Sequence, residues 1–173
     1  MCIRDRSVVV FQGLSAATAI VLGHSLGANR LETAKKEARY FFILSGIFTA
    51  LLMVFLFLFK GQFIHLYSVS GQVAADVDKC LIVFGLYMPA KMFNFINIVG
   101  VLRSGGDTKA CLFLDTSGVW FIGVPLAFLG GLVWKLPIYF VYGLVLSEEV
   151  YKLIFGYIRY RQGKWIRNLA IEV

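Results

Sequence analysis

Seven polar side chains interrupt long apolar stretches of this sequence, where they could carry chemistry away from bulk water. An ionised side chain at the centre of a bilayer costs about 2.5–3.5 kcal/mol on insertion scales, so each charge needs a partner or a watery cavity. Polar groups in such a setting often mark a path for an ion or a substrate. The candidates are Lys91, Asn94, Asn97, Asp115, Glu148, Glu149 and Lys152.

Lys91 is the single charge in the apolar run 80–102. Twenty-three helical residues at about 1.5 Å each span about 34 Å, so Lys91 lies near the middle of a bilayer core of ~30 Å. Glu148 and Glu149 follow Pro137 by about eleven residues and reach a similar depth. We expect Lys91 to pair with one of these acids. The pair is either a structural link between two helices or part of a site that couples substrate or ion movement, and the residues leave both open.

Each of the other candidates likewise has either a structural role or a role in substrate or ion movement. Glu148 and Lys152 are four residues apart and face one way on a helix, and Glu149 lies one turn from Lys152. The two acids balance the two lysines of this group. Asp115 we expect to be structural, whereas Asn94 and Asn97 either line a cavity or bond across helices. No candidate set has the composition of a metal site or of a catalytic nucleophile with its base.

Three residues are expected to break or bend helices. Pro89 leaves the carbonyl of Gly85 without its helical partner, which predicts an interruption just before Lys91 where that oxygen is available to a ligand or neighbour. Pro125 lies among several glycines and predicts a bend in the following helix.

Five apolar segments of suitable length position these residues, which predicts an all-α integral membrane fold. The expected spans are 8–29, 41–59, 80–102, 110–134 and 137–158. Asn29 followed by Glu32 predicts a capping box at the start of the second helix. Pro137 fits the first turn of the last helix, and Asp107 fits the N-cap position of the fourth.

The composition agrees with a membrane setting. The chain is 59% hydrophobic and 16% charged, with a mean hydropathy of +0.77, whereas soluble domains carry roughly 25% charged residues. The net charge of +7 does not indicate a nucleic-acid partner, because the basic residues flank apolar runs. The three cysteines lack metal-ligand or paired spacing.

Basic residues are distributed unequally between the two ends of the predicted bundle. Ten lysines and arginines follow the first, third and fifth spans, whereas Lys60, Lys79 and Lys135 make three on the opposite side. The positive-inside rule therefore predicts a cytoplasmic C-terminus and a chain that starts on the outer side. We expect a multi-pass protein of the plasma membrane. The ten are Arg30, Lys35, Lys36, Arg39, Arg103, Lys109, Arg159, Arg161, Lys164 and Arg167.

The first seven residues, MCIRDRS, match the in-frame translation of a common transposon-based sequencing adapter. We therefore expect residues 1–7 to be an artefact and residues 8–173 to be the natural sequence. An odd number of spans behind such a leader predicts that the natural protein has further sequence upstream.

Several stretches together resemble the multidrug and toxic-compound extrusion (MATE) transporters. GLSAATAIVLGHSLGANRLETAKKEAR is similar to a small-residue helix, turn and basic loop of that family, and VGVLRSGGDTK resembles its LR-x-GGDT turn. DTSGVWFIGVPLAFLGG and LSEEVYKLIFGYIRYRQGKWIRNL resemble its last two helices and basic tail. The likeness covers residues 8–169 in order.

The resemblance implies helices eight to twelve of a twelve-helix, two-lobe antiporter. Such a protein expels organic, often cationic, compounds in exchange for sodium ions or protons, with no other cofactor. Its implied partners are small organic substrates, the lipid bilayer and the missing N-terminal lobe of the same polypeptide. Some members carry an acid on the tenth helix near the position of Lys91 and Met92; none is present here, so we assign no cation-binding acid.

Two further function classes stay open. A lipid-linked saccharide flippase of the same wider superfamily would share helix count and lobe symmetry, although it would favour a more cationic cavity than these balanced charges form. A membrane-embedded enzyme would need a metal cluster or an activated nucleophile, and we expect the protein not to be an enzyme.

Overall fold

The computed structural model describes residues 3–66 and 71–166, and every regular element within these ranges is a helix. Met1 and Cys2 of the adapter-like segment, and Arg167 of the basic tail, lie outside the described residues. The elements are α1 (Ile3–Gly27), α2 (Leu31–Leu66), α3 (Gly71–Asn94), η1 (Phe95–Leu102), α4 (Thr108–Ser117), η2 (Gly118–Gly123), α5 (Val124–Phe128), η3 (Leu129–Val133) and α6 (Ile138–Arg161).

These elements form five continuous rods, because α3 runs directly into the π-helical η1 and the segments from α4 to η3 follow one another without a loop. Four stretches in the described part of the chain are long and apolar enough to cross a membrane: Val9–Gly27, Leu31–Gln62, Gly71–Leu102 and Thr108–Val133. The fifth rod, α6, carries three charged residues near its middle. The predicted all-α membrane fold is confirmed.

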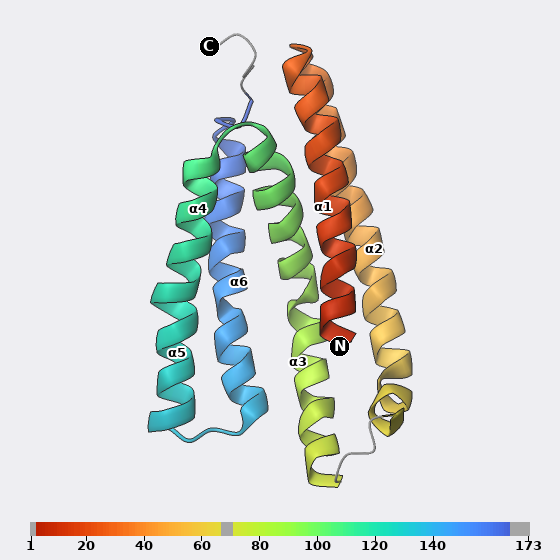
Figure 1. Ribbon diagram of the computed structural model, residues 1–173, viewed down its shortest axis with the longest axis vertical. Coiled ribbons are helices and arrows are strands. Elements are labelled where there is room, and N and C mark those ends of the chain that lie inside the picture. Colours follow the sequence, from red (N-terminus) through yellow and green to blue (C-terminus); the bar gives the residue numbers. More distant parts are fainter. Residues whose placement is uncertain (1–2, 67–70, 167–173) are drawn as a thin grey trace.

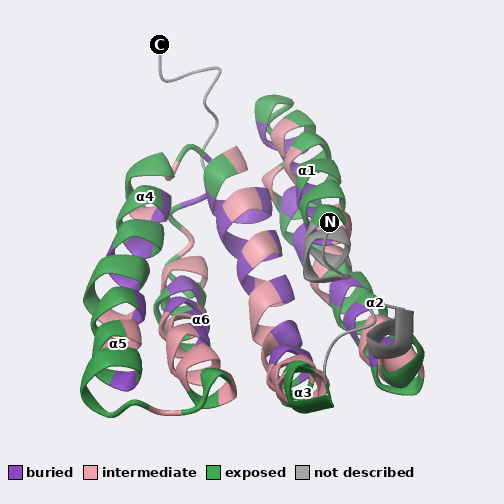
Figure 2. Cartoon of the chain, turned by 60° about the horizontal axis from the view of Figure 1, so that its bottom comes forward, coloured by how far each residue is buried: buried purple, intermediate pink, exposed green. Residues whose placement is uncertain are grey.

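The outer surface of the bundle is apolar. Ile20, Leu58 and Phe121 have 73%, 72% and 78% of their surface exposed. Figure 2 shows α2 and the α4–α5 rod largely exposed, whereas the central rod of α3 and η1 is mostly intermediate or buried. Proteins in water rarely expose apolar patches of this extent. These faces therefore suit contact with lipid.

The rod of α3 and η1 lies at the centre of the bundle. It packs against α6 on one side and against α1 and α2 on the other, and η2 packs against α6. Figure 1 shows the end of α1, the start of α2, the turn before α4 and the end of α6 at one end of the molecule. The end of α2, the start of α3 and the start of α6 lie at the other end. We call the first of these ends the basic end, because all the described members of the larger lysine and arginine group lie there.

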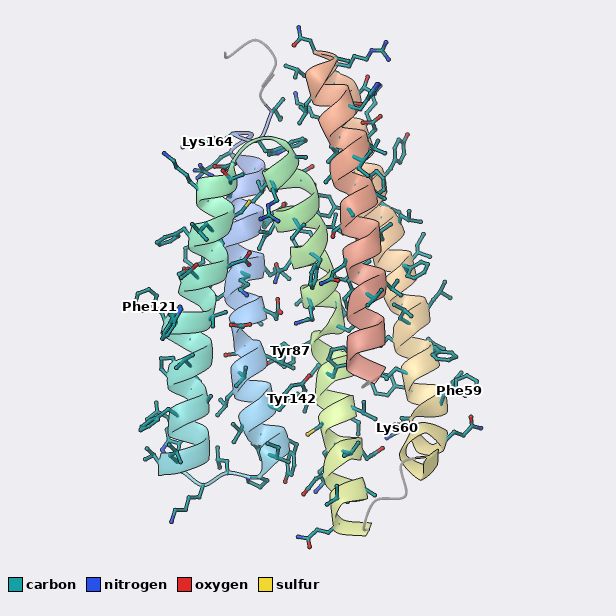
Figure 3. The ribbon with its side chains drawn as sticks, in the orientation of Figure 1. Phe59, Lys60, Tyr87, Phe121, Tyr142 and Lys164 are labelled. Atoms are coloured by element: carbon teal, nitrogen blue, oxygen red, sulfur yellow. The ribbon has the colours of Figure 1, made fainter. Side chains whose placement is uncertain are left out.

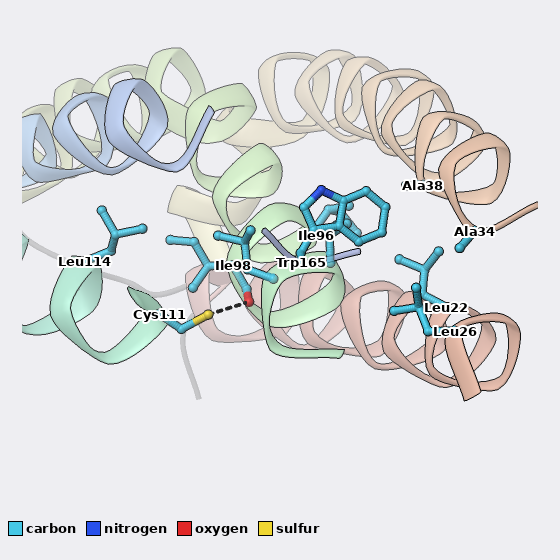
Figure 4. Close-up of a cluster of buried hydrophobic side chains, with 11 residues drawn as sticks. Leu22, Leu26, Ala34, Ala38, Ile96, Ile98, Cys111, Leu114 and Trp165 are labelled. Carbon is cyan, nitrogen blue, oxygen red and sulfur yellow. Dashed lines mark hydrogen bonds between the residues drawn. The ribbon is translucent and has the colours of Figure 1, made fainter. Parts of the chain in front are cut away.

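Two apolar clusters hold the rods together. The larger, at the basic end, joins α1, α2, η1, α4 and the residues after α6; Trp165 is buried in it and stacks on Tyr160. Figure 4 shows this cluster, in which the Cys111 thiol donates a hydrogen bond to the Ile98 carbonyl at 3.3 Å. The buried members of the smaller cluster come from α1, α2 and α3, and Phe95 of η1 and Tyr142 of α6 pack against them. These members are Phe11, Leu56, Phe84, Met88 and Met92.

The expected helix breaks at Gly85 and Pro89 are absent, since α3 continues through both residues. The buried Gly85 instead admits a neighbouring helix: a Cβ there would lie 2.9 Å from Cζ of Phe57 in α2. Pro125 also lies inside a helical segment, α5, with the π-helical η2 and η3 on either side. The departures from α geometry begin at Phe95, which follows Pro89, and at Gly118 and Leu129, which lie before and after Pro125.

Two predicted helix starts also differ in detail. Asn29 adopts a positive φ of 58° and the amide of Arg30 donates to the carbonyl of Ser25 at 2.9 Å, so Asn29 ends α1 and does not cap α2. The Glu32 carboxylate accepts a hydrogen bond from Lys35, not from Asn29. Pro137 precedes the first residue of α6 and serves as its N-cap residue.

Candidate functional site: a charged cluster between α3, η2 and α6

Lys91 and Glu149 form an ion pair across the interface of α3 and α6. The Lys91 Nζ lies 2.9 Å from Oε1 of Glu149, and Asn94 donates through Nδ2 to the carboxylate Oε2 at 2.9 Å and to the backbone carbonyl of Glu149 at 2.8 Å. Both carboxylate oxygens of Glu149 are therefore engaged, and only 6% of its side chain is exposed. This bonding compensates the cost of burying the carboxylate.

Lys152 lies one turn further along α6 and joins a second set of charges. Its Nζ is 3.5 Å from Oε1 of Glu148 and 3.8 Å from Oδ1 of Asp115, and 10% of its side chain is exposed. These separations exceed the normal N–H···O range, so the contacts are Coulombic and are not hydrogen bonds. Two glycines of η2 make room for them: a Cβ at Gly118 would lie 2.8 Å from the Lys152 stem, and one at Gly123 2.9 Å from the Glu148 carboxylate.

A cavity of about 220 Å³ separates the two sets of charges. Its polar lining consists of Lys91, Asn94, Asp115, Glu148, Glu149 and Lys152. The lining thus contains two lysines and three acids. Oδ1 of Asn94 is buried without a hydrogen-bond partner in the described structure. The volume suits a few water molecules or a small ion and is too small for a drug-sized molecule.

The structure brings six of the seven sequence candidates together around this cavity and leaves one apart. Glu149, not Glu148, contacts Lys91, and Glu148 contacts Lys152. Asp115, although 54% of its side chain is exposed, reaches Lys152. Asn97 is fully buried, with neither side-chain polar atom bonded, and lies against Gly156 of α6, where a Cβ would be 2.9 Å from its Nδ2.

Two polar contacts near the cluster were not predicted from the sequence. Arg159 donates to both carboxylate oxygens of Asp107 at 2.6 and 2.9 Å, and this hydrogen bonding raises the pKa of its guanidinium above an already high value. The Asp107 carboxylate thus joins the turn before α4 to the end of α6; it makes no N-cap hydrogen bond to α4. Further in, the hydroxyls of Ser117 and Tyr151 lie 3.1 Å apart. In the sequence, only the opposite charges of residues 107 and 159 hint at the first pair.

The ring of Tyr87 on α3 and that of Tyr142 on α6 lie between these two helices, on the side of the cluster away from the basic end (Figure 3). Lys164 marks the basic end in the same view, and Phe121 points outward from η2. Glu149, Lys152 and Glu148, with 6%, 10% and 15% of their side chains exposed, lie inside the bundle, whereas Asp115 at its edge is 54% exposed. Within the described residues, no group of three or more histidine, cysteine or acidic side chains could hold a metal ion.

Several long apolar helices that enclose paired charges point to a multi-pass membrane protein. The family model MatE matches residues 5–129, and the chain belongs to this family, that of the multidrug and toxic-compound extrusion transporters. The recognition made from the sequence motifs is confirmed.

Three relatives show how much of a family member the chain covers. The uncharacterized transporter YisQ of Bacillus subtilis is 25% identical over 158 residues, 90% of this chain and 34% of its own length. The multidrug resistance protein MdtK of Photorhabdus laumondii is 24% identical over 69% of this chain and 26% of its own length. The probable multidrug resistance protein NorM of Streptococcus pneumoniae is 27% identical over 66% of this chain and 25% of its own length. The chain therefore spans about a third of YisQ and about a quarter of the other two. No solved structure matches it.

Proposed function

We propose that the chain is part of the C-terminal lobe of an antiporter that expels organic, often cationic, compounds from the cell in exchange for sodium ions or protons. The observation that carries the proposal is the family match over residues 5–129, together with relatives named as multidrug resistance proteins. The activity belongs to the longer polypeptide in the plasma membrane, since alternating access requires a second lobe against which this one can move.

The charged cluster supports an ion-linked role within that activity. A proton or cation that entered the 220 Å³ cavity would meet three acids, and Lys152 is held there only by contacts of 3.5 and 3.8 Å. Occupancy by an ion would compete with Lys152 for Glu148 and Asp115. The binding of the ion would in this way change the contacts between α6 and η2, which is the kind of differential interaction that coupling needs.

The test is transport by the complete protein. The coding sequence that contains residues 8–173 would be recovered from its source DNA and expressed in a bacterial host without its major drug exporters. We expect active efflux of ethidium. The sodium gradient and the proton gradient are then collapsed separately, and the gradient whose loss stops efflux identifies the coupling ion. The 173-residue chain expressed alone should not change ethidium retention.

The same cells distinguish the flippase alternative. Ethidium retention equal to that of the empty host, combined with accumulation of a lipid-linked saccharide when the gene is deleted from its source, would contradict the efflux proposal.

Glu148→Gln in the complete protein should lower efflux, because Glu148 lines the charged cavity. Lys35→Gln is the control and should lower efflux less, because Lys35 pairs with the exposed Glu32 at the protein surface.

A further inference from the structure

A second hollow lies on the outer face of the bundle, between α4 and α6 at the basic end. Its volume is about 440 Å³. One end is polar and is formed by Lys109, Arg159 and Gln162; the rest is apolar, with Phe113, Tyr151 and Phe155 along it. We call this hollow the α4–α6 groove. It shares no lining residue with the charged cavity.

The polarity of the groove changes along the helix axes. Lys109 lies in the first turn of α4 and Phe113 one turn further in, while on α6 the lining runs inward from Gln162 through Arg159 and Phe155 to Tyr151. Both walls thus pass from polar to apolar in the same direction. This gradient matches that of a lipid, whose charged headgroup lies at the interface and whose chain points to the membrane centre.

The length of the groove fits one leaflet. From Gln162 to Tyr151 is eleven residues, about 16 Å of helix, close to half of the ~30 Å hydrocarbon core. The apolar walls are open to the surroundings: Phe113 is 66% and Phe155 48% exposed. A single acyl chain would cover them.

The charge at the polar end selects the headgroup. Arg159 is committed to Asp107 by two short hydrogen bonds and donates through its third nitrogen to Gln162 at 3.3 Å. Lys109 takes part in no ion pair within the described part of the chain and is exposed. One ammonium is therefore available, which complements one negatively charged headgroup.

We propose that the α4–α6 groove binds one anionic phospholipid, with its phosphate on Lys109 and an acyl chain along Phe113 and Phe155. The lipid fills the open side of the contact between α4 and α6 and so supports the packing that places Lys152 beside Asp115. This site is independent of the transported compound.

The test uses the whole chain purified in detergent and native mass spectrometry with added phosphatidylglycerol or phosphatidylcholine. We expect one phosphatidylglycerol molecule to be retained preferentially. Lys109→Gln should weaken its retention about fivefold, as expected for the loss of one lysine–headgroup contact. Ala110→Phe leaves the charge in place but fills the groove, and should abolish preferential retention.

Lys36→Gln is the matched control, because it removes the same charge at the same end of the molecule but lies on α2, away from the groove. It should retain phosphatidylglycerol as the unchanged protein does. Equal retention of the two lipids, an equal loss in Lys36→Gln, or unchanged retention in Ala110→Phe would each overturn the proposal. Circular dichroism of every variant confirms that helical content is preserved.

Discussion

The buried carboxylate of Glu149 depends on two side chains of one neighbouring helix, Lys91 and Asn94. Its charge is compensated by the Lys91 ammonium at 2.9 Å, and its remaining oxygen by the Asn94 amide at 2.9 Å. Loss of either donor leaves part of a buried anion unpaired. Loss of the anion leaves a lysine in an apolar helix face. Burial of the Glu149 carboxylate therefore depends on Lys91, and burial of the Lys91 ammonium depends on Glu149.

At the residue scale we predict that Lys91 and Glu149 are energetically coupled. Lys91→Ala and Glu149→Gln should each lower the free energy of unfolding by about 1–3 kcal/mol, less than the 3–5 kcal/mol for fully buried pairs because 22% of the Lys91 side chain is exposed. The double variant should cost less than the sum, by between about 0.5 and 3 kcal/mol. Unfolding in mixed detergent with increasing dodecyl sulfate measures all three.

Glu148 provides the control for this cycle, since it neighbours Glu149 in sequence but contacts Lys152. Lys91→Ala combined with Glu148→Gln should show weaker coupling than the Lys91–Glu149 cycle, because Lys91 and Glu148 line one cavity but form no ion pair with each other in the described structure. Strong coupling to Glu148 and none to Glu149 would show that the two acids have exchanged roles. If the Lys91–Glu149 double variant recovers stability in the complete transporter but not ethidium efflux, the pair also acts in transport.

At the scale of elements, η1 approaches α1 closely through one glycine. A Cβ at Gly100 would lie 2.9 Å from Cγ2 and 3.0 Å from Cβ of Thr18, and 3.4 Å from the Ser15 carbonyl. Neither the β-branched Thr18, whose hydroxyl is bonded to Leu14, nor the backbone of α1 can move away cheaply. The absence of a side chain at position 100 allows the two rods to pack.

We therefore predict that Gly100→Ala destabilises the protein by about 1–3 kcal/mol through overpacking. Gly23→Ala is the matched control, because nothing lies within 4 Å of a Cβ built there. It should be neutral, or stabilising by up to about 1 kcal/mol through better helix propensity. The same detergent unfolding assay compares the two; equal effects would show that α1 and η1 do not meet at Gly100.

The helices and the place of each charge along its helix were predictable from the sequence, and the choice of partners was not. An apolar run with Lys91 at its centre specifies how far along the helix axis Lys91 lies. It does not specify rotation about that axis, and Glu148 and Glu149 differ by about 100° around α6. Rotation depends on packing against glycines such as Gly118 and Gly123. The π-helical segments add a further uncertainty, because each turns the following side chains away from α-helical positions, as at Asn97.

At the scale of the whole molecule, the described lysines and arginines of the three connections gather at one end, as counting by loop predicts. We predict that this basic end faces the cytoplasm. A fluorescent reporter that folds only in the cytoplasm should be active when fused after Val173. Alkaline phosphatase, which needs an oxidising exterior, should be active when fused after Lys135 and inactive after Lys109. The reverse pattern would contradict the orientation.

The two apolar clusters give the bundle unequal ends. The basic end is fastened by Trp165, by the close approach of Gly105 to the Trp165 backbone, and by the Asp107–Arg159 pair. The smaller cluster, further from the basic end, joins α1, α2 and α3, and among the described residues of α6 it contacts Tyr142. Beyond the basic end, α6 is held chiefly by α3, through close packing and the Lys91–Glu149 ion pair. Any movement of α6 relative to α3 therefore alters the charged cluster, because Lys91 and Asn94 lie on one of these helices and Glu149 lies on the other.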